Sequence, residues 1–236
     1  MTFKNVLMGC AVLAAGGLAI TAVVQAQTPS KASFFVTSAG KGKGADLGGL
    51  EGADAHCAAL ATAAGLVRSN WRAYLSATST KDKDGKDVPG VNARERIGNG
   101  PWLNSKGVVI ARNVAALHSE RAKITQDTAL TEKGERIPGR VEGLAKTAAN
   151  QHDILTGSDP AGMYSTAGGD TTCGNWTKGS GEAPANSAIV GHHDRVGLND
   201  FRHMKSWNSA HGSRGCSQDN LKASGGAGQF YCFSSK

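Results

Sequence analysis

The sequence predicts an α+β protein built from short, mainly antiparallel strands, one main N-terminal helix and two disulfides. Outside its N-terminal leader the chain has four cysteines, Cys57, Cys173, Cys216 and Cys232, and an even cysteine set in an exported chain is typical of a disulfide framework. One segment, residues 50–66, spaces its apolar residues as a helix does, and several short segments have the composition or alternation of strands. Aromatic residues make up only 6% of the chain, and 32 of its 236 residues are glycine. This composition indicates a thin core and many loops.

The first 26 residues have the pattern of a secretory signal. The positive charge of Lys4 precedes a nearly continuous apolar stretch over positions 6–24, and Val24-Gln25-Ala26 is a small-x-Ala cleavage pattern. A retained membrane anchor is the alternative, because the stretch approaches the roughly 20 residues that span a bilayer. We therefore expect a secreted, periplasmic or cell-surface protein with no stable membrane span after cleavage. Its single domain is expected at 34–236, after a short linker at 27–33.

The first half of the domain contains the strongest local signals. Residues 34–37 read Phe-Phe-Val-Thr, a short β-prone strand. Apolar residues of the 50–66 segment recur at spacings of three and four, and Gly65 supplies a stop. Cys57 is therefore expected on the buried face of this helix. Residues 71–76 alternate in polarity and predict a second strand.

The middle of the chain is harder to assign. Residues 78–90 are rich in Asp, Lys and Gly and predict a turn region, while 107–111 predict another strand. Residues 113–170 are mixed and low in large apolar residues, with a short helix expected only near 114–122. We expect this segment to be a long irregular loop, and such a loop is rare in a compact domain unless it is functional. A further strand is expected to include residues 188–190.

Two blocks carry a family resemblance. The first runs from Gly52-Ala53-Asp54-Ala55-His56-Cys57 to Trp71-Arg72-Ala73-Tyr74-Leu75-Ser76, a helix cysteine followed by an Arg-Ala-aromatic-Leu-Ser strand. The second begins at Asn175-Trp176, continues through Trp207-Asn208 and ends in an aromatic-Cys strand at Phe233. Together these blocks resemble the C-type lectin-like superfamily, in particular its exported bacterial and endostatin-like branch. The resemblance covers nearly the whole expected domain.

Four cysteines allow three connectivities on paper. The resemblance implies that Cys57 pairs with Cys232, which ties the first helix to the last strand. It also implies that Cys173 pairs with Cys216 and that the long loop carries the ligand site.

The chain departs from the family at the residues that bind calcium. Where calcium-dependent lectins have Trp-Asn-Asp, this sequence has Trp207-Asn208-Ser209, and Glu182-Ala183-Pro184-Ala185-Asn186 only loosely matches the other half of their site. Calcium takes about six to eight oxygen ligands, several of them carboxylates, and too few carboxylates cluster here. No cofactor is therefore expected, with calcium left open as the alternative.

The segment Gly191-His192-His193-Asp194-Arg195 combines imidazole and carboxylate groups, which are ligands of zinc and related metals. His203 and His211 lie within reach in sequence. Adjacent residues of a strand point to opposite faces, so His192 and His193 are not expected to share one metal. No metal site is predicted. The plainer interpretation is a strand that enters a polar turn, in which Asp194 and Arg195 pair or cap.

Ligand contacts are expected from the later part of the chain. Arg195 offers a planar fork for a carboxylate or sulfate, and both it and His193 are expected at the surface. Trp176 could stack on a sugar ring, with burial in the core as the alternative. The candidate ligand-binding residues are Asn175, Trp176, His192, His193, Asp194, Arg195 and Asn208.

The formal net charge of +7 favours acidic partners. The basic residues are scattered rather than grouped in runs, so nucleic acid is not the expected partner. The chain has neither a Gly-x-Ser-x-Gly nor a His-Glu-x-x-His motif, and paired cysteines cannot act as nucleophiles. We expect a non-catalytic exported module that binds glycan or an anionic cell-envelope polysaccharide. A structural or adhesive envelope protein and an exported metal-dependent hydrolase are the alternatives, and the oligomeric state is left open.

Overall fold

A computed structural model describes residues 30–235 of the chain, so the expected signal segment lies outside the described residues. The strands are β1 (Phe34–Val36), β2 (Trp71–Ala73), β3 (Thr80–Lys81), β4 (Asp87–Val88), β5 (Trp102–Leu103), β6 (Val109–Ala111), β7 (Asp153–Leu155), β8 (Ile189–His192), β9 (His211–Gly212) and β10 (Gly226–Ser234). The helices are α1 (Gly49–Ala63), α2 (Ala93–Arg96), α3 (Val114–Leu117), α4 (Arg140–Leu144), α5 (Cys173–Trp176), the 3-10 helix η1 (Arg202–Lys205) and α6 (Gln218–Ser224). The expected α+β class with short strands is confirmed.

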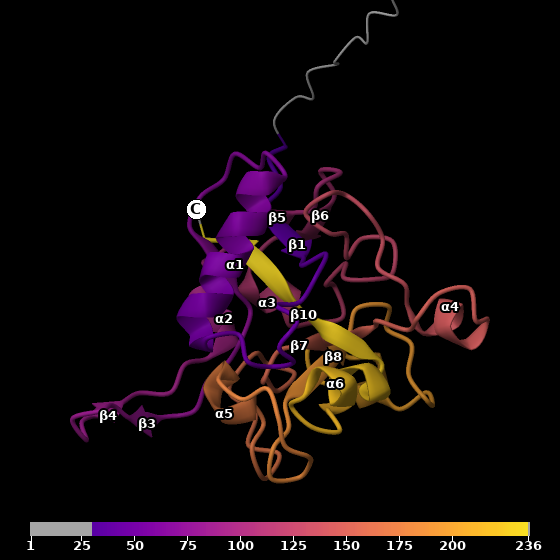
Figure 1. Ribbon diagram of the computed structural model, residues 1–236. Coiled ribbons are helices and arrows are strands. Elements are labelled where there is room, and N and C mark those ends of the chain that lie inside the picture. Colours follow the sequence, from indigo (N-terminus) through magenta and orange to yellow (C-terminus); the bar gives the residue numbers. More distant parts are fainter. Residues whose placement is uncertain (1–29, 236) are drawn as a thin grey trace, which may run out of the picture.

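The longest strand, β10, organises the main sheet (Figure 1). Its C-terminal half lies between β1 and β2, both antiparallel to it, and its N-terminal half pairs in parallel with β7. The sheet then continues through β8 and β9 in antiparallel order. The last strand of the chain therefore joins the N-terminal strands to the segment that holds most of the histidines.

Both faces of β10 are buried, and successive residues enter different cores. Phe230 and Cys232 belong to the core on the side of α1. Tyr231 and Phe233 belong to a second core, which also contains Trp102. A strand covered on both sides reads as a nearly continuous apolar run, as Phe230-Tyr231-Cys232-Phe233 does.

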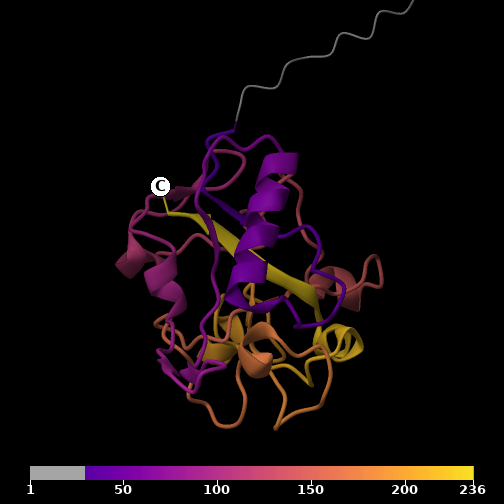
Figure 2. The same ribbon diagram turned by 60° about the vertical axis from the view of Figure 1, so that its left-hand side comes forward.

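Helix α1 crosses one face of the sheet in front of β10 (Figure 2). Its buried residues, Ala53, Cys57 and Ala61, follow the spacing of four residues that brings side chains onto one helix face. The helix ends slightly earlier than the sequence predicts, and Gly65 follows with φ of 68°, a left-handed conformation that glycine adopts without steric cost. The small side chains let the helix approach the sheet closely.

Two disulfides hold the fold, with the connectivity that the family resemblance implies. Cys57 on α1 is bonded to Cys232 on β10, and Cys173 on α5 is bonded to Cys216. The first bond joins the main helix to the central strand. The second ties the start of the 173–216 segment, which contains β8 and β9, to its end.

The expectation of an irregular loop over residues 113–170 is wrong in an important part. This stretch contains α3, α4 and β7, and β7 is a fully buried member of the main sheet. The apolar residues Leu117, Ile124 and Ile137 of the 113–170 stretch pack in the second core. The strand was missed because only three residues form it, and its position is determined by pairing with distant strands β8 and β10.

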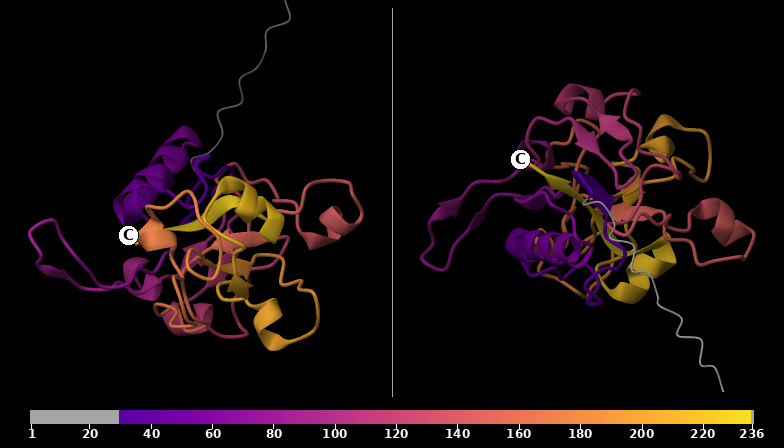
Figure 3. Two further views of the ribbon diagram at one scale, coloured as in Figure 1. Left: turned by 60° about the horizontal axis from the view of Figure 1, so that its bottom comes forward. Right: turned by 90° about the horizontal axis from the view of Figure 1, so that it is seen from above.

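Two segments project from the body. The β3–β4 hairpin and α4 extend on opposite sides in both views (Figures 1 and 3). The hairpin corresponds to the charged turn region expected at 78–90. Among the described residues, no helix has the length and apolar character that a membrane crossing requires.

Candidate metal centre

Strands β7, β8 and β9 bring histidine and aspartate side chains together. Asp153 on β7 is the register partner of His192 on β8, and His211 on β9 pairs with Val190. Val190 and His192 are two residues apart on one strand, so they share a face. The three strands therefore place Asp153, His192 and His211 on one side of the sheet.

His152 completes the group from the residue before β7. Its ring stacks on that of His192, with ring centroids 4.1 Å apart and planes inclined by 10°. Its Nε2 lies 3.1 Å from Oδ1 of Asp153. His152, Asp153 and His192 are all buried, and each offers a ligand atom within 4.8 Å of the other two.

The remaining distances place His211 beside Asp153 and His192, next to this group of three. Oδ1 of Asp153 lies 3.2 Å from Nε2 of His192 and 3.6 Å from Nε2 of His211. The two Nε2 atoms of His192 and His211 are 3.0 Å apart. In a tetrahedral site with metal–ligand bonds of about 2.0–2.1 Å, neighbouring ligand atoms are roughly 3.3–3.4 Å apart. The three separations from Oδ1 of Asp153 and the one between His192 and His211 scatter around that value.

The outer nitrogens of the three imidazoles fix which ring atom faces the centre. Nδ1 of His152 lies 3.2 Å from Oδ1 of Asp194. Nδ1 of His192 lies 2.7 Å from the Met204 carbonyl, and Nδ1 of His211 lies 3.0 Å from the Gly212 carbonyl. These oxygens accept, so each Nδ1 carries the proton and donates. In a neutral ring the unprotonated Nε2 then faces Asp153, which is the arrangement found around metal-binding histidines. His152, whose pKa is raised to about 9, has to lose its second proton before it can bind a metal.

Asp153 is the least satisfied group in this cluster. Its side chain is 2% exposed, and neither carboxylate oxygen has a hydrogen bond of proper geometry to any residue between 30 and 235. A buried carboxylate without such bonds is costly, and a cation bound beside it would compensate it.

The electrostatics of the cluster are strongly perturbed. Burial acts to raise the pKa of Asp153, but the imidazoles of His152, His192 and His211 outweigh it and hold that pKa well below its usual range. Burial opposes a charge on His152, yet Asp153 and Asp194 raise its pKa to about 9. Groups that shift one another this far mark candidate functional sites.

Gly191 lies on β8 directly before His192, and it lets this strand pass close to a neighbouring segment. A Cβ at this residue would lie 1.9 Å from the carbonyl oxygen of Trp207. The absence of a side chain therefore allows β8 to pass directly beside the 206–208 segment. His192 and its hydrogen-bond partner Met204 depend on this close approach.

Only some of the predicted ligand-binding residues lie at the histidine cluster. His192 points into the cluster, whereas His193 lies outside it, as strand alternation predicts. Asp194 supports His152 and accepts hydrogen bonds from the backbone N–H groups of Arg140 and Val196. The capping role considered for Asp194 is thus present.

The expectation of surface exposure is wrong for His193 and only partly met for Arg195. His193 is fully buried, and burial lowers its pKa to about 4. The Arg195 guanidinium donates to the carbonyls of Ile124 at 2.8 Å and Ala122 at 3.2 Å, and lies 3.5 Å from that of Lys205. Its fork is occupied by the protein's own backbone.

The other three candidates are also engaged in the fold. Asn175 binds the backbone of Thr78 through both its carbonyl oxygen and its amide nitrogen. Trp176 is fully buried and donates to the Ser76 carbonyl at 2.8 Å. Asn208 is 1% exposed, donates to Tyr74 Oη at 3.0 Å and lines a groove of about 450 Å³.

Arg195→Ala is expected to destabilise the protein by about 3 kcal/mol, because it leaves buried backbone carbonyls without their charged donor. Urea unfolding measures the change. Arg202→Ala is the matched control, since Arg202 is 93% exposed and 3.9 Å from Glu120, and it should cost no more than about 0.5 kcal/mol. Equal stability of the two variants would show that the carbonyl contacts of Arg195 contribute little.

No protein-family model matches the chain, and a search of curated proteins finds no match. The sequence analysis missed His152 and Asp153 because both lie in the segment expected to be a loop. One signal was present: a His-Asp dipeptide occurs at 152–153 and again at 193–194. The structure brings these two dipeptides into contact through His152 and Asp194.

Proposed function

We propose that the protein is an exported transition-metal-binding module, with His152, Asp153, His192 and His211 as ligands. The observation that supports this most directly is the orientation of the imidazoles. Each Nδ1 lies within hydrogen-bond distance of an oxygen, and the three Nε2 atoms lie 3.1, 3.2 and 3.6 Å from Oδ1 of Asp153, whose carboxylate has no hydrogen bond of proper geometry to residues 30–235. Without a metal, one of the two Nε2 atoms of His192 and His211, which lie 3.0 Å apart, has to carry a proton and donate it to the other.

The chemistry of the donors favours a metal of the zinc class. Imidazole nitrogens suit Zn²⁺, Cu²⁺, Ni²⁺ and iron, whereas Ca²⁺ and Mg²⁺ prefer oxygen ligands. The short separations between ligand atoms fit bonds of about 2.0–2.1 Å rather than the longer bonds of calcium. Zinc is the metal that we propose, with copper and nickel as chemically related competitors.

With His211 added to His152, Asp153 and His192, four protein ligands would satisfy a tetrahedral metal, and this supports a non-catalytic role. Catalytic zinc sites keep one position for water or substrate, whereas structural sites are closed. The His211 side chain is 28% exposed, while those of His192 and Asp153 are each 2% exposed. Metal would therefore enter and leave on the His211 side, at the edge strand β9. The proposed module binds and holds the metal rather than using it to activate water.

The metal proposal is tested by unfolding the protein with and without metal. Protein freed of metal with EDTA and dialysed should melt roughly 5–10 °C higher with zinc at 100 times its dissociation constant, because the ligand adds about 2.7 kcal/mol. Calcium at millimolar concentration should leave the melting temperature unchanged. Isothermal titration should give one zinc per chain, and a failure of zinc to bind would leave the cluster as a histidine–aspartate network only.

We also propose that the fold is C-type lectin-like and that the chain is exported, as the sequence pattern implies. The disulfide connectivity supports the first proposal, because the bonds Cys57–Cys232 and Cys173–Cys216 are those that the resemblance implies. Stable disulfides are typical of oxidising compartments, which supports the second. Binding of an anionic polysaccharide stays a proposal, and a separate pocket supplies the groups for it.

A further inference from the structure

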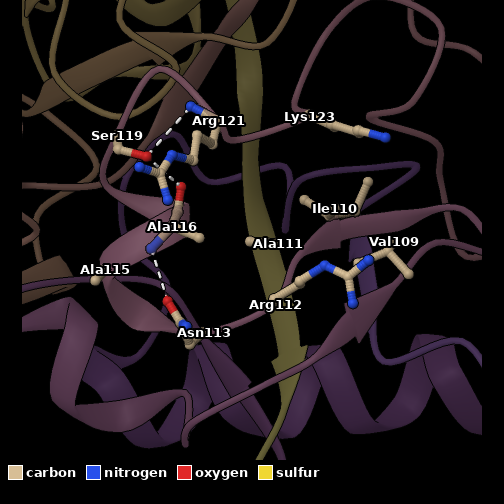
Figure 4. A pocket seen from close by; sticks show the side chains of 10 residues that line it. All are labelled: Val109, Ile110, Ala111, Arg112, Asn113, Ala115, Ala116, Ser119, Arg121 and Lys123. Carbon is tan, nitrogen blue, oxygen red and sulfur yellow. Dashed lines mark hydrogen bonds between the residues drawn. The ribbon is translucent and has the colours of Figure 1, made fainter.

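A pocket of about 590 Å³ lies away from the histidine cluster, between β6, α3 and the residues that follow α3 (Figure 4). None of its lining residues is a proposed metal ligand. Its volume is in the range of sites that bind small organic ligands. Val109, Ile110, Ala111 and Ala116 supply apolar surface, and Asn113 and Ser119 add polar groups.

Three cations surround this surface. Arg112, Arg121 and Lys123 line the pocket and are all exposed, and Figure 4 shows them arranged around Ile110 and Ala111. Their side chains form no ion pair with the residues described, 30–235. No acidic residue of that range lines the pocket. The pocket is therefore positively charged, with its charged side chains available to a ligand.

The backbone that carries these cations is well held. Ala111 on β6 pairs with Trp102 on β5. The Lys123 N–H donates to the Ile110 carbonyl at 2.8 Å, which fastens the segment after α3 against β6. Asn113 caps α3 by accepting from the Ala116 N–H at 2.8 Å. Because the points of attachment of these side chains are fixed, less ordering is needed when a ligand binds.

We propose that this pocket binds a carboxylate-bearing sugar of an acidic polysaccharide. Arginine binds a carboxylate through two parallel N–H groups, and lysine adds a third positive charge. The apolar floor suits the C–H groups of a sugar ring. The side-chain N–H groups of Asn113 can donate to its hydroxyls, while Oδ1 of Asn113 and the Ser119 hydroxyl bind backbone groups of the protein. The pocket has no aromatic residue, whereas single-stranded nucleic acids stack on aromatic side chains, so the lining favours sugar over nucleic acid.

Oligogalacturonate and oligoalginate are the probes for this site, with affinity measured by titration calorimetry. The test variant is the triple substitution Arg112→Gln, Arg121→Gln and Lys123→Gln. The control is Lys81→Gln, Lys83→Gln and Lys86→Gln, which removes the same charge from the exposed β3–β4 hairpin. The test variant should weaken binding of at least one oligouronate by roughly tenfold or more, and the control should change it by less than about twofold.

Three further measurements define the ligand. The same oligomer with its carboxylates reduced to alcohols should not bind. Binding should weaken as sodium chloride rises, because salt screens exposed charges over about 10 Å at 0.1 M. Binding should be equal in EDTA and in zinc, since the pocket shares no residue with the metal centre.

Several outcomes would overturn the proposal. One is a wild-type protein that leaves both oligouronates unbound, and another is a hairpin control that loses as much affinity as the pocket variant. The first result rejects a uronate site, and the second reduces the interaction to net charge. A protein that binds only single-stranded DNA or phosphatidylglycerol vesicles would have a different polyanion as its ligand.

Discussion

Asp153→Asn is expected to abolish zinc-dependent stabilisation of the protein. The substitution keeps the shape of the side chain but removes the only anionic donor among the four proposed ligands. If zinc affinity falls a hundredfold, a zinc concentration that stabilises the wild type by about 2.7 kcal/mol would stabilise the variant by only about 0.4 kcal/mol. Calorimetry measures the affinity, and thermal unfolding in EDTA and in zinc measures the stabilisation.

Two further variants separate the metal centre from general histidine chemistry. His203→Ala should bind zinc as the wild type does, because His203 is exposed on η1 and lies outside the convergent group. Asp194→Asn should weaken zinc binding by roughly 10–100-fold, since Asp194 orients His152 without contacting the metal. If Asp153→Asn binds zinc normally while His203→Ala does not, the metal lies elsewhere and the proposed centre is wrong.

The elements that the sequence predicted well are those with a local cause. The helix near 50–66 has a continuous spacing of small apolar residues, and its register alone puts Cys57 on the buried face. The β-prone strand at β1 and the strand at β2 are similarly local, although both are shorter than expected. The disulfide partners needed the family resemblance, because cysteine spacing alone leaves three connectivities open.

The candidate metal centre could not be predicted, because its residues come together only through the pairing of distant strands. Asp153 and His192 are separated by 38 intervening residues, yet they are register partners. Residues 153–155 are too few to show a period, and their pairing with β10 is parallel to a strand near the chain's end. The sequence provided His192 and His211, but the packing of three short strands brought Asp153 to them.

The pocket lined by Arg112, Arg121 and Lys123 shows a second kind of error in the sequence analysis. Arg195 attracted attention because it follows two histidines and an aspartate, whereas Arg112 and Arg121 stand among ordinary residues. The Arg195 side chain donates to backbone carbonyls of the protein, whereas Arg112 and Arg121 form no ion pair with residues 30–235. Residue type alone cannot distinguish these situations, since the difference lies in which backbone groups are nearby.

Removing the Cys57–Cys232 disulfide is expected to destabilise the protein more than removing Cys173–Cys216. The two bonds close loops with sequence separations of 175 and 43. Loop-closure entropy gives losses of about 5 kcal/mol for the longer loop and about 4 kcal/mol for the shorter one. Domains are commonly stable by only about 5–15 kcal/mol, so paired Cys57→Ala and Cys232→Ala substitutions remove much of the total.

The two paired-alanine variants are compared by urea unfolding in EDTA, so that metal does not contribute to the difference. All four cysteines are fully buried, so both variants also leave small cavities that add a similar cost. The order of the two losses is therefore set mainly by loop length. A greater loss from the Cys173–Cys216 pair would contradict this reasoning. It would show that the shorter cross-link chiefly stabilises the native arrangement of β8 and β9, and zinc affinity should then fall in the same variant.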